Sequence, residues 1–149
     1  MSVSQPRLTI DYSTDFSLDI QFSEEDQHAP LGYFDFSCHV HHFTGQFAYT
    51  RRNTCFAPQT FHDFAGQLDA IRKGTAQRAE FHEVADMIVF SVEVHGRDTT
   101  ASLRIRQHQL NGEETWLSAG FRVDYDLFVN ALYRRACEFF RDLVGTDSD

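Results

Sequence analysis

The sequence lacks several features that would assign it to a membrane or secreted class. No stretch of the 149 residues approaches the run of about 18 apolar residues that a membrane-spanning helix needs. The opening MSVSQPRLTIDYS has no charged segment followed by an apolar run, so we predict no signal peptide. Three cysteines, an odd number without Cys-X-X-Cys spacing, favour reduced thiols. We therefore expect a cytoplasmic protein that does not contact a membrane.

Basic residues are also scarce. The chain has 13 lysines and arginines against 22 aspartates and glutamates, a net charge of −9. This average field repels phosphate backbones, so we expect no nucleic-acid partner. A basic protein would instead be attracted and steered toward the surface.

Glycine-rich turns between a strand and a helix are missing too. The usual phosphate cradles are therefore absent, and we predict no cofactor.

The pattern that is present predicts an α+β fold. Apolar residues recur at spacings of three and four from Pro58 to Gly74 and from Asp124 to Leu143, which predicts two helices. Period-two alternation predicts strands in residues 8–12, 16–22, 34–40, 47–49, 79–81, 88–94, 101–105 and 117–123.

Short spacings between these strands favour an antiparallel, meander-like sheet of six to eight strands. We expect the two helices to pack on one face of it and the other face to be polar and open. The chain shows no internal sequence repeat and no linker. We expect a single domain over residues 1–149, frayed at its N-terminal residues and at 145–149.

The stretch SCHVHHF, residues 37–43, concentrates three histidines and a cysteine. On a strand, His39 and His41 point to one side, while Cys38 and His42 point to the packed side. Two histidines form at most half of a metal site, and the third ligand would have to come from residues such as His82, His95 and His108. The preferred interpretation is two exposed histidines on an open sheet face. A small metal-binding protein or a metal-dependent enzyme using His39 and His41 is the alternative.

Other chemical groups do not converge on a catalytic motif. Cys38 and Cys137 fall among core positions, and no base stands beside Cys55 in the sequence. One basic stripe, Arg104, Arg106 and His108, is interpreted as forming cross-strand ion pairs. We therefore predict that the protein is not an enzyme.

The order and content of several segments resemble the WapI-type immunity proteins of bacterial polymorphic toxin systems. The segments are DFSLDIQF, FSCHVHHFTGQFAY, FHDFAGQLDAI, MIVFSVEVHG, ASLRIRQ and AGFRVDYDLFVNALYRRACEFF, and the likeness covers about Asp15 to Leu143. The resemblance implies a protein that binds and neutralises a toxin domain and that has no shared catalytic residue.

These observations predict a non-catalytic protein-binding domain whose partner is a basic toxin domain. An acidic inhibitor would gain speed of association with a basic toxin. The candidate contact residues combine the acidic positions near the second strand with the exposed histidines: Asp19, Glu24, Glu25, Asp26, His39 and His41.

Overall fold

The computed structural model describes residues 7–13, 16–24, 33–42, 45–108 and 111–144; their side chains are described except at 12–13, 16–24, 33, 42, 53, 108 and 144. Within these residues the chain forms four strands and a helix, and then four strands and a helix again. In order, the elements are β1 (Arg7–Ser13), β2 (Phe16–Glu24), β3 (Tyr33–His42), β4 (Gly45–Cys55), α1 (Pro58–Arg72), β5 (Arg78–His82), β6 (Ile88–His95), β7 (Asp98–His108), β8 (Glu114–Val123) and α2 (Tyr125–Val144).

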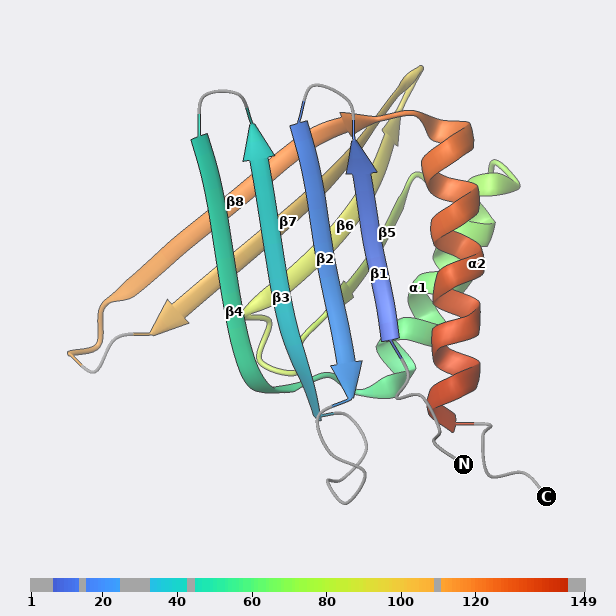
Figure 1. Cartoon of the computed structure of the whole chain (residues 1–149). Coiled ribbons are helices and arrows are strands. Elements are labelled where there is room, and N and C mark those ends of the chain that lie inside the picture. The colour runs from blue at the N-terminus through green and yellow to red at the C-terminus, as the bar shows by residue number, and fades with distance from the viewer. Residues whose placement is uncertain (1–6, 14–15, 25–32, 43–44, 109–110, 145–149) are drawn as a thin grey trace.

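The strands form two antiparallel sheets of four, with the orders β1-β2-β3-β4 and β5-β6-β7-β8. Figure 1 shows the second sheet behind the first, with its strands running obliquely across those of the first. Each sheet is a simple meander, because every strand pairs with its neighbour in sequence.

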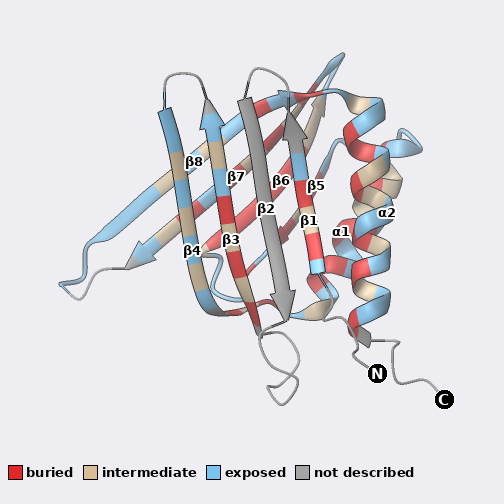
Figure 2. Ribbon diagram, viewed as in Figure 1, coloured by how far each residue is buried: buried red, intermediate tan, exposed pale blue. Residues whose placement is uncertain are grey.

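Alternation along each strand separates an inner from an outer face. In β3, Phe34, Phe36 and Cys38 are buried, whereas the intervening Ser37 and His39 are half-buried and exposed. Figure 2 shows the resulting alternation of colours along this strand. Strand β6 differs, since five consecutive residues from Ile88 to Val92 are buried. Its outward-facing residues Val89 and Ser91 therefore also have little contact with solvent.

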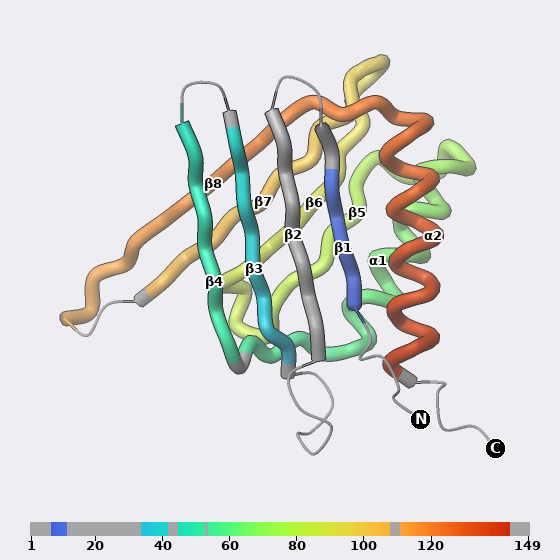
Figure 3. The backbone as a smooth tube through the Cα atoms, viewed as in Figure 1, coloured from blue at the N-terminus to red at the C-terminus, as the bar shows by residue number. Residues whose placement is uncertain are grey.

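The helices lie together at one side of the sheets. Helix α1 packs along β5, α2 packs along β1, and the two helices contact each other. Figures 1 and 3 show both helices at the edge of the sheets formed by β1 and β5. Helix α1 ends where Gly74 adopts a φ of 79°, a conformation that glycine adopts without strain. The Asp124 carboxylate caps α2 by accepting a hydrogen bond from the Leu127 amide at 3.1 Å.

One continuous core joins both sheets and both helices. Its centre is rich in phenylalanine, and Phe61 of α1 is fully buried there. The Phe61 ring lies 4.8 Å from Phe139 of α2, 5.2 Å from Phe81 of β5 and 5.8 Å from Phe34 of β3, measured between centroids. A single side chain thus connects elements from both halves of the chain.

The predicted α+β class, antiparallel strands and two helices are confirmed. The difference is that the strands form two sheets of four instead of one meander-like sheet of six to eight. The helices accordingly lie along β1 and β5 instead of covering one face of a single sheet. Alternation identifies the apolar face of a strand, but it does not reveal whether a helix or another sheet covers that face.

Candidate functional site

The histidine pair occupies the outer face of the first sheet. His39 and His41 are both exposed, and their rings lie nearly parallel with centroids 6.4 Å apart. The His39 Nε2 atom is 3.2 Å from the Gln46 Oε1 atom of β4. Cys38 is buried at 2% exposure, so the predicted division between inner and outer positions is confirmed for these three residues.

The suggested third metal ligands lie elsewhere. His82 Nδ1 is 2.8 Å from the Asp86 carboxylate, and His95 Nε2 is 3.1 Å from the Glu93 carboxylate. Both histidines belong to the second sheet, while the His108 side chain lies outside the described residues. Among the side chains that the structure describes, no group of three histidine, cysteine, aspartate or glutamate residues could hold a metal ion.

The acidic candidates fall largely outside the described part of the chain. Glu25 and Asp26 lie beyond it, and only the backbone is described at Asp19 and Glu24 of β2. In the strand register, Asp19 stands opposite His39 of β3 and Asp11 of β1. The register therefore brings Asp19 next to the histidine pair.

Cys137 lies in a groove between the helices. This groove of about 310 Å³ is lined by His62, Tyr133, Cys137 and Phe140 among others. A hydrogen bond with Cys137 raises the pKa of the Tyr133 hydroxyl. Cys137 is half-buried, in keeping with its predicted place beside the core stripe.

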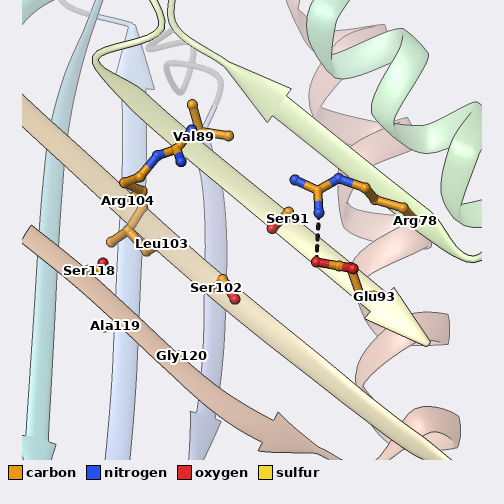
Figure 4. A pocket seen from close by; sticks show the side chains of 10 residues that line it. All are labelled: Arg78, Val89, Ser91, Glu93, Ser102, Leu103, Arg104, Ser118, Ala119 and Gly120. Carbon is orange, nitrogen blue, oxygen red and sulfur yellow. Dashed lines mark hydrogen bonds and ion pairs between the residues drawn. The ribbon is translucent and has the colours of Figure 1, made fainter. Parts of the chain in front are cut away.

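A second candidate site, which sequence reasoning missed, is a trough on the outer face of the second sheet. Small side chains form its floor in one row across three strands, Ser91 of β6, Ser102 of β7 and Gly120 of β8. The adjacent row consists of Val89, Arg104 and Ser118. The trough has a volume of about 350 Å³. In Figure 4, Arg104 and Val89 mark one end of it, and the Arg78–Glu93 ion pair marks the other.

Arginines on this face differ in their electrostatic environment. Arg78 pairs with Glu93 at 2.6 Å, Arg106 lies 3.9 Å from Glu114, and Arg122 lies 3.8 Å from Asp98. Arg104 is exposed and stands between Val89 and Ser118 in the register. Within the described part of the chain, no carboxylate pairs with Arg104.

This arrangement revises the prediction for the basic stripe. Arg106 has the expected cross-strand carboxylate, but the neighbours of Arg104 are an apolar and a hydroxyl side chain. The alternation in SLRIRQ correctly places the stripe on the face opposite the apolar residues. Only the strand register could show which arginine faces a carboxylate.

An exposed tryptophan adjoins this stripe. Trp116, the sole tryptophan of the chain, is 58% exposed, and the Arg106 guanidinium lies 5.6 Å from its ring centroid. The buried Arg106 Nε atom has no hydrogen-bond partner within the described residues. We define the outer face as Arg78, Ser91, Ser102, Arg104, Arg106, Trp116, Ser118 and Gly120, and we call it the arginine–tryptophan face.

Comparison with known proteins gives a likeness of fold. No protein-family model and no curated protein matches the sequence. A chain from the solved structure described as "Crystal structures of trypanosoma bruciei MRP1/MRP2" is similar, with a TM-score of 0.54 and 12% sequence identity. The alignment covers 97% of this chain and 89% of that chain. At this identity, the likeness shows a shared arrangement of strands and helices.

Over the described residues, neither α1 nor α2 combines the length and apolar character that a bilayer-spanning helix requires.

Proposed function

We propose that this protein is a non-catalytic protein-binding domain and that it acts by covering a partner protein. The observation that carries this proposal is Trp116, a 58% exposed tryptophan beside Arg106 on a sheet face that neither of the described helices covers. Tryptophan and arginine are the residue types most enriched among side chains that dominate binding energy at protein interfaces. The large, rigid indole ring beside a guanidinium offers the kind of contact area that such dominant side chains use, which supports a contact role for this face.

The location of the helices leaves room for such a contact. Helices α1 and α2 occupy the side next to β5 and β1, so they do not lie across the arginine–tryptophan face. A broad sheet face suits a protein partner, because standard interfaces bury about 800 Å² on each side.

The cellular role we propose is that of an immunity protein neutralising a toxin domain in the cytoplasm. The segment-level resemblance to WapI-type immunity proteins supports it. The net charge of −9 also supports a basic partner, because a long-range field of this sign accelerates association with a positively charged protein. His39, His41 and the acidic residues near them provide a second contact region in this proposal.

Co-expression tests the role directly. The toxin-domain protein encoded immediately upstream should arrest growth alone, and this chain should relieve the arrest and co-purify with it. Raising the salt from 0.1 M to 1 M shortens the Debye length from about 10 Å to about 3 Å and should slow association. Growth arrest that this chain does not relieve, with no complex formed, would refute the role.

Surface variants identify the contact face. Trp116→Ala should weaken the complex about 30-fold or more, the loss expected when a dominant interface tryptophan is truncated. Leu127→Ala is the matched control, because Leu127 is a 74% exposed apolar residue at the start of α2. Equal affinities of the Trp116 variant and the unaltered protein would exclude this face as the contact.

A further inference from the structure

We propose that the trough on the arginine–tryptophan face receives a carboxylate group from the protein partner and that Arg104 is its pairing residue. This inference rests on the proposed protein-binding function and specifies the chemistry that one part of the surface recognises. The occupant is an aspartate or glutamate side chain carried by a loop or an extended segment of the partner.

The shape of the trough permits close approach. Gly120 has no side chain, and its row neighbours Ser91 and Ser102 have short ones. A partner segment can therefore lie near the floor while Arg104 remains at one end (Figure 4). The volume of about 350 Å³ falls at the lower end of the range of about 300–1,000 Å³ for binding sites.

The floor also carries a hydroxyl group. Ser91 is only 6% exposed and lines the trough. A serine hydroxyl can donate a hydrogen bond to a carboxylate oxygen that reaches the floor.

Charge complementarity identifies the occupant. The carboxylates Glu93, Glu114 and Asp98 already lie near Arg78, Arg106 and Arg122. Arg104 remains the arginine of this face without such a neighbour in the described residues. A guanidinium pairs with a carboxylate through two parallel hydrogen bonds, which gives both strength and direction.

A nucleic-acid strand is the competing occupant, because exposed tryptophan and arginine also bind stacked bases and phosphates. Its backbone would bring one negative charge per nucleotide toward Glu80, Glu93 and Glu114, which lie beside the arginines of this face, and toward a protein of net charge −9. One arginine without a carboxylate neighbour matches one carboxylate better than a series of phosphates.

Nuclear magnetic resonance on the whole chain tests the proposal. The probe is the capped tripeptide N-acetyl-glycyl-glutamyl-glycinamide, and its glutamine counterpart is the control. We expect the glutamyl peptide to produce saturable shifts of the Arg104 side-chain Nε–H and of the Ser91, Ser102 and Gly120 amides. The glutamine peptide should produce none, because it lacks the charge that pairs with the guanidinium.

Two arginine variants make the test specific. Arg104→Gln should raise the Kd of the glutamyl peptide about tenfold or more, the loss expected for a hydrogen bond to a charged group. Arg97→Gln, in the turn between β6 and β7, should leave it unchanged. Equal effects of the two variants, or the absence of saturable shifts, would overturn the proposal. If oligothymidylate displaces the peptide and binds the same residues more tightly, the trough is a nucleic-acid site and the carboxylate proposal is wrong.

The outcomes also separate this inference from the proposed function. If Arg104→Gln still neutralises the toxin domain and the peptide does not bind, the carboxylate site fails while the binding function stands. If the peptide binds but the unaltered protein forms no complex with the toxin domain, the site stands while the immunity role fails.

Discussion

The ring of Phe61 in α1 meets the ring of Phe139 in α2 edge to face, with centroids 4.8 Å apart and planes at 86°. This contact joins the helix that ends the first half of the chain to the helix that ends the second. Both rings are almost completely buried, and Phe61 also contacts phenylalanines of β3 and β5. The packing of the two halves therefore depends strongly on this one position.

Truncation of Phe61 should lower the free energy of unfolding by about 3–5 kcal/mol, because the cavity left by Phe→Ala is surrounded by elements that cannot all close on it. Urea unfolding of Phe61→Ala measures the loss. Should that variant not fold, Phe61→Leu provides the measurement with a smaller expected loss. Leu127→Ala, at a 74% exposed position, should change stability by less than about 0.5 kcal/mol. Similar losses at both positions would contradict the central role of Phe61.

Gly120→Ala should stabilise the protein by about 0.5–1 kcal/mol, because glycine in a strand interior has more conformational freedom to lose on folding. The added Cβ atom would lie 3.6 Å from the Ser102 Oγ atom, an ordinary contact distance. Gly74→Ala is the contrasting variant, and at a φ of 79° it should destabilise by about 1 kcal/mol. Thermal or urea unfolding of both variants measures the change in the free energy of unfolding. A destabilised Gly120→Ala variant would show that the trough floor has no room for the added methyl group.

The ion pair between Asp69 and Lys73 predicts a pH dependence on α1. The Lys73 ammonium lies 2.8 Å from the Asp69 carboxylate, and this hydrogen bond lowers the pKa of Asp69 below its ordinary value of 3.8. Since the folded pKa lies below the unfolded one, the pair stabilises the fold above pH 3.8, and this contribution disappears as the pH falls through the folded pKa.

Carboxyl-carbon NMR should therefore place the Asp69 titration midpoint below 3.8 in the native protein. Lys73→Met should move the midpoint upward toward that value, whereas Arg141→Met, at the far end of α2, should not move it. An unchanged midpoint in the Lys73 variant would show that the pair does not form in solution.

Metal content should distinguish the binding-domain hypothesis from the metalloprotein alternative. His39 and His41 provide two imidazoles, and zinc sites in proteins use three or four protein ligands. Protein purified without a histidine tag should contain far less than one equivalent of zinc or iron. Near-stoichiometric metal that is lost in the His39→Ala, His41→Ala double variant would instead support the alternative.

Local patterns in the sequence predicted the approximate position of each strand and helix that the structure describes, although β4 continues to Cys55, beyond the predicted residues 47–49. The alternation in strand β3 predicted that Cys38 is buried while His39 and His41 are exposed, and the structure confirms this. Spacings of three and four predicted α1 and α2 to within a few residues. These features follow from the backbone geometry of strands and helices, in which side-chain direction depends only on neighbours along the chain.

Contacts between residues far apart in the sequence determined how these strands and helices are arranged. The sequence shows no internal repeat, yet the structure contains the same order of four strands and a helix twice. Whether eight strands form one sheet or two depends on which apolar faces meet, and Phe61 joins the halves through contacts with residues as distant as Phe139.

The sequence by itself determined the α+β class, the approximate positions of the described elements and the buried side of strands such as β3 and β7. Only the tertiary structure decided the division into two sheets, the location of the trough and the difference between Arg104 and its paired neighbours. The physical reason is that the electrostatic environment of a charged side chain depends on the groups within a few ångströms of it in space. Strand register places Val89 and Ser118, and not a carboxylate, beside Arg104.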